Sequence, residues 1–364
     1  MGGNALKNIS VSRISNEYYM MIKNKIKQDM SKYFFIEYLF DLPNKIDHGD
    51  LDILYVSNKS FDIREVIIKL YNPFEIVSNG NIISFSFDRK LIDYRTEIFE
   101  PIYFQIDLIK CPSIEMIPTY KFYLSYGDFG AILGKIVHFY GLKFGQDGLW
   151  LNLLESTIAE HQFQTFDNKI DQTTSTIKII LCTKSQDICK FLNLDYEKWL
   201  EGFKDVKEIY SFIMSTPLFD KRIFNILNND HRKRIKMRQF YCDFLNHIGI
   251  DLLNDINRAN SKNGEIYKNI QLDAIKYFNK ISELEYFIEQ KQLKIERCKK
   301  FNGKTIIDYL NKNNISYDNH QISKHICDFN KYVLNKYKYD NFDVYLDNNN
   351  IISVQNDLIN YLIN

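Results

Sequence analysis

The spacing of apolar and polar residues predicts alternating helices and strands in the first part of the chain. Two of the short apolar runs flank Ser78-Asn79-Gly80-Asn81, where the Asn-Gly pair is a strong hairpin signal. These elements predict a mixed sheet with helices on one face. In chain order they are a helix at 15–33, strands at 34–40 and 51–56, a helix at 62–71, strands at 74–77, 82–87 and 101–109, and a helix at 126–140.

Helical spacing dominates the rest of the chain, although a turn leads into a strand at 142–151. A strand at 176–182, with a helix after it, predicts a small α/β unit. We therefore expect an α+β fold whose C-terminal half is mainly helical. Its later helices are expected at 265–300, as one long helix or two, at 305–312, at 321–336, and after a polar loop at 347–350.

Two carboxylates stand at the start of the apolar strand at 51–56. Alternate residues of a strand point to the same face, so Asp50 and Asp52 are expected to project together. Like charges beside a core are costly unless a cation lies between them, and hard divalent cations prefer oxygen ligands. Asp107 stands alone in a similar apolar run. Three carboxylates from two strands suit a two-metal site for phosphoryl displacement, whereas an acid pair that merely faces solvent is the alternative.

The residues around these acids resemble a known family. Gly49-Asp50-Leu51-Asp52-Ile53-Leu54, followed by Gln105-Ile106-Asp107-Leu108-Ile109, looks like the catalytic core of the DNA polymerase β-like nucleotidyltransferases, which include poly(A) polymerases and CCA-adding enzymes. The resemblance covers residues 1–155. It implies that Asp50, Asp52 and Asp107 are catalytic and bind two Mg²⁺ ions, or Mn²⁺, with Asp107 as base or orienter for the attacking hydroxyl.

The phosphate-binding turn departs from this family. Its members carry a Gly-Gly or Gly-Ser pair shortly before the acids, where this chain has Phe40-Asp41-Leu42-Pro43-Asn44-Lys45. Either Gly2 and Gly3 fold back to hold the triphosphate at a helix N-terminus, or the 41–45 turn does so through Lys45. The resemblance places further nucleotide contacts at Gly49, Ser125, Tyr126 and Lys143.

The net charge of +1 hides a basic region. Residues 215–304 hold eighteen Lys and Arg against eleven Asp and Glu, a balance of +7 that leaves −6 for the remainder. A near-neutral chain with one basic half is a reasonable nucleic-acid binder. We expect one helix after a cap at 228–230, with Met237, Phe240, Phe244 and Ile248 inward. This helix carries a cluster of basic residues without an acid among them, and we expect the cluster to bind nucleic acid. The alternative is that it is only a solvated helix face. The candidates are Arg232, Lys233, Arg234, Lys236 and Arg238.

The remaining features of the sequence indicate the compartment in which we expect the protein. Six scattered cysteines without a C-x-x-C pair predict reduced thiols in a cytoplasmic protein rather than zinc or disulfides. We expect neither a membrane span nor a signal peptide, since no apolar run is long enough. His48 is expected to be a solvated turn residue.

Together these features predict a Mg²⁺-dependent nucleotidyltransferase that uses a nucleoside triphosphate to extend an RNA 3′ end. Two alternatives stay open: a small-molecule nucleotidyltransferase, and a non-catalytic RNA-binding module on the same fold. The expected domains are a nucleotidyltransferase domain at 1–155, a small α/β unit passing into a basic helical region at 156–260, and a helical domain at 261–364.

Overall fold

The computed structural model describes residues 5–57, 60–93, 102–154, 176–225, 229–250, 264–313, 316 and 318–363. Their contacts divide the chain into two compact units. The first holds the described residues up to 152 and those from 178 to 280. The second holds the described residues from Ile281 onward. It also holds the ends of two strands from earlier in the chain, at 153–154 and 176–177. The three domains expected from the sequence, with boundaries at 155 and 260, stay a prediction.

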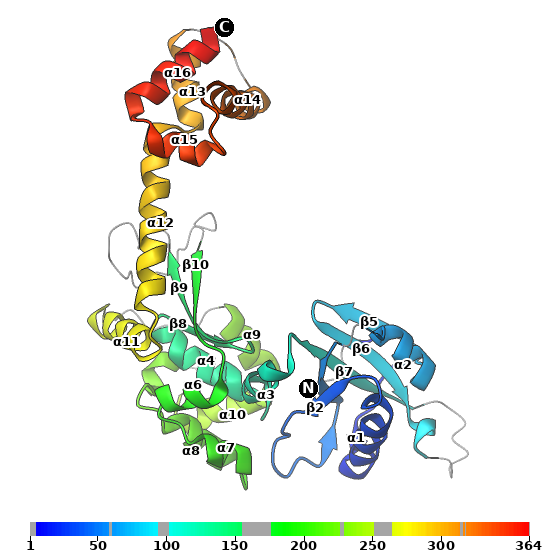
Figure 1. The fold of residues 1–364 in the computed structure, drawn as a ribbon. Coiled ribbons are helices and arrows are strands. Elements are labelled where there is room, and N and C mark those ends of the chain that lie inside the picture. The colour runs from blue at the N-terminus through cyan, green and yellow to red at the C-terminus, as the bar shows by residue number, and fades with distance from the viewer. Residues whose placement is uncertain are drawn as a thin grey trace. The chain divides into compact units, whose positions relative to one another are not determined.

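A five-stranded mixed sheet forms the N-terminal part of the first unit (Figure 1). Its order is β2-β4-β7-β6-β5, with β4 and β7 parallel and the other neighbours antiparallel. The predicted Asn-Gly hairpin between β5 and β6 is confirmed, and Gly80 there takes a φ of +57°. The strands are β2 Phe35–Tyr38, β4 Asp50–Val56, β5 Ile76–Asn79, β6 Ile82–Asp88 and β7 Tyr103–Cys111.

Two helices cover one face of this sheet (Figure 1). α1 (Asn16–Met30) buries a stripe spaced three or four residues apart, as a helix requires. α2 (Ile63–Tyr71) starts where the Asp62 side chain accepts hydrogen bonds from two backbone N–H groups. Both pack against Leu51, Ile53 and Tyr55 of β4 and their counterparts on β6 and β7. The alternate positions, including Asp50, Asp52 and Asp107, therefore point to the other face.

The rest of the first unit is mostly helical. A helix missed by the sequence analysis, α3, packs on the second face of the sheet; it buries residues on several sides, so it lacks a clear apolar stripe. The helices are α3 Ile117–Leu124, α4 Phe129–Phe139, α6 Ser185–Phe191, α7 Tyr196–Glu201, α8 Val206–Met214, α9 Asn229–Met237, α10 Gln239–His247 and α11 Gly264–Tyr277. Short 3-10 turns lie at Arg89–Leu91, Ile114–Met116 and Lys221–Asn225.

Two small sheets complete this unit, apart from the strand ends that belong to the second unit. β8 (Leu142–Gly145), β9 (Gly148–Leu154) and β10 (Thr176–Cys182) form one, in the order β10-β9-β8. β1 (Ile14–Ser15) pairs with β3 (Asp47–His48) in the other. This last pairing brings the N-terminal segment beside the start of β4.

The single helix expected through the basic cluster is in fact two helices. α9 ends at Met237, Arg238 has an extended backbone with φ −124° and ψ 99°, and α10 begins at Gln239. Met237 is 47% exposed instead of inward, whereas Phe240 and Phe244 are buried as expected. The break at Arg238 lets α10 turn its apolar stripe into the core independently of the polar α9.

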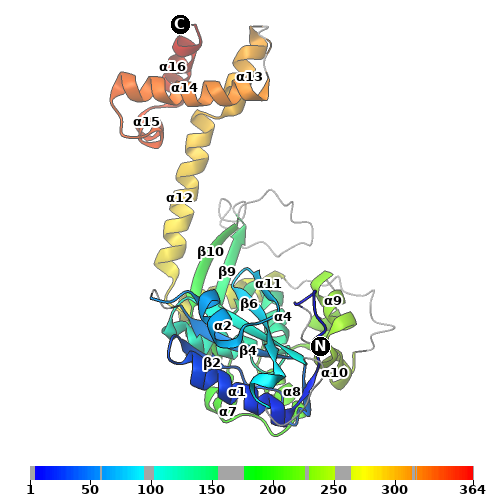
Figure 2. The same cartoon turned by 90° about the vertical axis from the view of Figure 1, so that its right-hand side faces the viewer.

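The second unit is helical apart from the two strand ends (Figure 2). The segment 265–300 forms two helices, α11 and α12 (Ile281–Lys300), which belong to different units. α13 (Gly303–Lys312), α14 (Asn319–Tyr337), α15 (Phe342–Asn348) and α16 (Ile351–Ile363) share a core around Phe329 and Tyr345. The expected loop at 347–350 is shorter, because Asp347 belongs to α15, where it pairs with Arg297 of α12.

Two chain-wide features belong with the fold. Each of the six cysteines is a free thiol in the structure. Within the described residues, no helix combines the length and apolar character that a membrane crossing requires.

Candidate active site

β4 and β7 bring the three predicted carboxylates to adjacent strands, as expected from the sequence. Because the strands are parallel neighbours, Asp52 lies beside Asp107 in the register and Asp50 lies beside Gln105. Burial, followed by the charges of Asp50 and Asp107, raises the pKa of Asp52 well above its usual value. The site therefore disfavours its own negative charge unless a cation is present.

Asp107 is held by a neighbour that the sequence analysis did not single out. Gln105 Nε2 donates to both carboxylate oxygens of Asp107 at 2.9 Å, and Gln105 Oε1 accepts from the N–H of Ala5 at 2.9 Å. Burial raises the pKa of Asp107 to about 6, while hydrogen bonds from Ser84 and Gln105 oppose that rise. The same-face rule for strands could have identified Gln105, two residues before Asp107.

The donor chemistry of this cluster suits a hard divalent cation, which takes carboxylate oxygens. Among the described residues, however, no group of three or more His, Cys, Asp or Glu side chains is placed to hold a metal ion. Gln105 bonds to both oxygens of Asp107. Asp50 and Asp52 are therefore the first residues suited to hold a cation, and Asp107 can join them while it keeps its bonds to Gln105, because each carboxylate oxygen has a second lone pair.

A pocket of about 440 Å³ opens beside Asp50 and Asp52. Its lining comes from β4, the segment before β3, the α3–α4 junction, and the α9–α10 junction. Opposite charges meet in it. The acids that line it are Asp41, Asp50, Asp52 and Asp128, and the cations are Arg13, Lys45, Arg234 and Arg238.

Of the two proposed phosphate-binding segments, the structure describes the one that contains Lys45. Lys45 lines the pocket, and the Lys45 side chain makes no hydrogen bond or ion pair with another described residue. Gly2 and Gly3 lie outside the described residues, but Ala5, just after them, reaches the acids through Gln105. The two alternatives for the phosphate-binding segment therefore both stay open.

The other predicted nucleotide contacts divide into two groups. Gly49 lines the pocket directly before β4. Ser125 and Tyr126 are buried: the Ser125 hydroxyl accepts from the N–H of Phe40 at 3.0 Å, and the Tyr126 ring stacks on the Phe40 ring. Neither lines the pocket, and Lys143 on β8 does not line it either. The structure thus gives Ser125 and Tyr126 contacts within the fold.

His48 is not the solvated residue expected from its turn-like neighbours. It is 1% exposed, and its ring stacks on Tyr19 with ring centres 3.5 Å apart. Burial, with Lys45 nearby, lowers the pKa of His48 to about 4. Tyr19 also donates its hydroxyl to Asp41 at 2.9 Å. The physical reason is tertiary: α1 covers the strand on which His48 lies.

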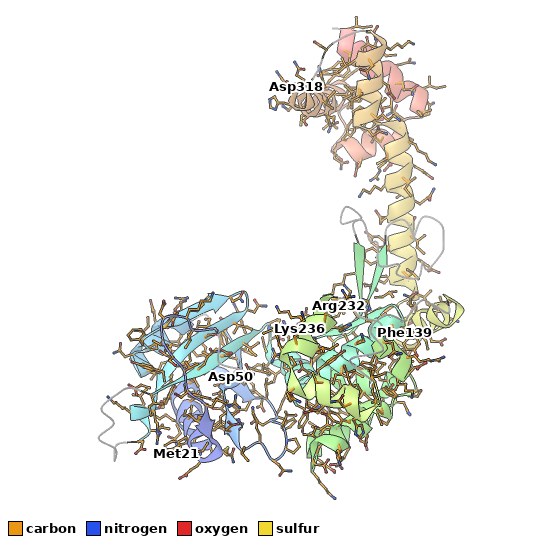
Figure 3. All side chains as sticks on the ribbon, turned by 180° about the vertical axis from the view of Figure 1, so that it is seen from behind. Met21, Asp50, Phe139, Arg232, Lys236 and Asp318 are labelled. Atoms are coloured by element: carbon orange, nitrogen blue, oxygen red, sulfur yellow. The ribbon has the colours of Figure 1, made fainter. Side chains whose placement is uncertain are left out.

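Some residues of the basic cluster line the pocket and others do not. Arg234 and Arg238 line it, and Arg234 Nη1 donates to Asp128 Oδ1 at 2.7 Å. Arg232, Lys233 and Lys236 are exposed and do not line it; Figure 3 labels two of these on α9 and Asp50 on the sheet. This helix was expected in a separate domain from the acids, and residues at its C-terminal end line the same pocket as Asp50 and Asp52.

Arg13 is a pocket residue that the sequence gave no reason to select. Its Nε and Nη2 atoms donate to the two carboxylate oxygens of Asp47 at 2.8 and 2.9 Å. The contact depends on the pairing of β1 with β3, thirty or more residues apart in the chain. Local periodicity carries no signal for such a pairing.

The pocket thus offers carboxylates that suit a divalent cation and, beside them, side chains that suit phosphate. This combination fits a phosphate-bearing ligand that binds together with a metal. No family model matches the chain, and the search of curated proteins finds no match to it either.

Proposed function

We propose that this chain is a Mg²⁺-dependent nucleotidyltransferase that adds ribonucleotides to the 3′ end of an RNA. The observation that carries the proposal is the meeting of Asp50 and Asp52 with Lys45, Arg234 and Arg238 in one pocket. Carboxylates favour Mg²⁺, and ammonium and guanidinium groups favour phosphate oxygens. A nucleoside triphosphate requires both kinds of partner.

The roles of the acids follow from their positions. Asp50 and Asp52 would hold the cations, with Asp107 on the acceptor side. Bound Mg²⁺ would lower the pKa of the acceptor hydroxyl and neutralise the charge on the phosphates. Asp107, whose pKa is about 6, is suited to orient that hydroxyl or take its proton near neutral pH. The hydroxyl oxygen would bond to the α-phosphorus, and pyrophosphate would leave.

The sequence supports the same assignment. The residues around Asp50, Asp52 and Asp107 resemble those of the DNA polymerase β-like nucleotidyltransferases, and the acids lie on adjacent parallel strands. We further expect the protein to act in a reducing compartment, the cytoplasm, because its cysteines are free thiols.

The test is incubation of the full chain with a short end-labelled RNA, Mg²⁺ and each ribonucleoside triphosphate in turn. We expect the RNA to lengthen, and the product length with each nucleotide identifies what is added. An Asp50→Asn, Asp52→Asn double variant serves as the inactive control.

Failure to extend RNA with any nucleotide would reject RNA tailing. Release of pyrophosphate in the presence of a small hydroxyl-bearing acceptor would then favour a small-molecule nucleotidyltransferase. RNA binding that neither needs Mg²⁺ nor consumes nucleotide would favour a non-catalytic binding module.

A further inference from the structure

α9 carries its basic residues on two opposite sides. Successive residues of a helix turn by about 100°, so Arg232, Lys233 and Lys236 share one side. His231 and Arg234 lie on the other side. Arg238, one turn after Arg234, lines the pocket with it, while the residues of the first side do not.

The inner side of α9 is fixed to α4 by two contacts. Lys135 Nζ lies 2.8 Å from His231 Nδ1, and Arg234 Nη1 donates to Asp128 at the N-cap of α4. Lys135 and Asp128 are both buried. Because the two bonded residues of α9 are about one turn apart, the helix cannot rotate about its axis without losing a contact.

The outer side of α9 is left as a positive strip. Arg232, Lys233 and Lys236 are exposed, and their side chains make no hydrogen bond or ion pair with another described residue. The sequence from Arg232 to Arg238 contains no acid that could neutralise them. Closely spaced exposed cations suit consecutive phosphates of a single strand.

We propose that α9 separates the two polyanions of the reaction. Arg234 on the inner side and Arg238, which directly follows the helix, bind the phosphates of the nucleotide, and Arg232, Lys233 and Lys236 on the outer side bind the backbone of a single-stranded RNA acceptor. This inference rests on the proposed function and assigns a substrate to each side. The arrangement places the acceptor strip on the same helix that lines the pocket of Asp50 and Asp52.

The test compares two pairs of substitutions that remove equal charge. Arg232→Gln with Lys236→Gln changes the outer side, and Arg234→Gln with Arg238→Gln changes the inner side. The probes are a labelled twelve-nucleotide oligo(A), titrated over a range of salt, and each ribonucleoside triphosphate with Mg²⁺.

The outer pair is expected to weaken RNA binding and to flatten its log–log salt slope by about 1.4, at roughly 0.7 per phosphate contact on a single strand. Its nucleotide dissociation constant should not change. The inner pair is expected to weaken nucleotide binding at least about tenfold and to leave the RNA salt slope as in the parent. Lys190→Gln with Lys207→Gln, exposed on α6 and α8, is the charge-matched control and should affect neither.

Two results would overturn the inference alone. In the first, the variant with both outer substitutions keeps the RNA affinity and the salt slope of the parent. In the second, the outer and the inner variants each lose affinity for RNA and for nucleotide to the same extent. Arg238→Gln by itself replaces the inner pair if loss of the Arg234–Asp128 bond lowers the melting temperature. If the parent binds neither RNA nor nucleotide, the proposed function fails as well.

Discussion

At Asp52, most of the surrounding charges and the burial of the side chain shift the pKa in the same direction. Burial, Asp50 and Asp107 all raise its pKa, and Lys45 is the cation that opposes them. A carboxylate in such a position lowers the stability of the fold without a bound cation. Its presence is therefore easier to explain by ligand binding than by folding.

Asp52→Asn tests this explanation, because it keeps the size of the side chain and removes the charge. If Asp52 holds a cation, turnover should fall by at least about a hundredfold, which is about 2.7 kcal/mol of transition-state stabilisation. The melting temperature without metal should hold or rise, since one repelling charge is gone. Asp340→Asn, exposed in the second unit, is the matched control. An unchanged turnover number would exclude Asp52 as a ligand.

Gln105 offers a second residue-scale prediction, on pH. Its amide donates to Asp107 and so opposes the effect of burial, and the pKa of this carboxyl is raised to about 6. In Gln105→Ala that pKa should rise further, because the hydrogen bond to the charged form is lost. The acidic limb of the pH profile of kcat/KM should then move to higher pH. A limb at the same pH as in the parent would mean that Gln105 does not tune Asp107.

At the scale of the element, the chain relies on backbone conformations that particular residues allow. Gly80 takes a left-handed φ in the β5–β6 hairpin, and nothing lies within 4 Å of the position a Cβ would occupy. The cost of a side chain at this position is therefore conformational and not steric.

Gly80→Ala should lower the free energy of unfolding by about 1 kcal/mol, the usual cost of the left-handed region for a residue with a Cβ. Gly303→Ala is the matched control: Gly303 opens α13, its φ is not left-handed, and its nearest neighbour would be 3.5 Å away. That substitution should be neutral or stabilising, since alanine favours helices. Equal effects of the two in chemical denaturation would contradict this account.

At the scale of the whole molecule, each unit has its own apolar core. Among the described residues, the core around Phe329 is built from those between 301 and 362, and the pocket is lined by those between 13 and 240. The pocket and the core around Phe329 therefore draw on different parts of the chain.

A chain truncated after Lys280 should keep the nucleotide affinity of the full chain, because every pocket-lining residue is retained. A fragment of 281–364 should unfold cooperatively, with helical circular dichroism, because its core residues are all present. Loss of nucleotide binding in the first fragment, when that fragment is folded, would show that the second unit contributes to the site.

The sequence by itself determined most of the local elements and the residues with the clearest chemical signal. Period-two alternation assigned Asp50 and Asp52 to one strand face, and Asn-Gly identified the β5–β6 hairpin, because both signals lie within a few residues of chain. The isolated acid in a second apolar strand pointed to Asp107 for the same reason.

Only the tertiary structure decided which distant residues share the pocket. The β1–β3 pairing brings Arg13 there, contacts with α4 orient α9 so that Arg234 faces Asp128, and α1 buries His48. It also broke the predicted basic helix at Arg238, since packing of Phe240 and Phe244 governs α10. These contacts and the helix break depend on packing between residues that are far apart in the chain. Such packing overrides local periodicity and cannot be read from a short stretch of sequence.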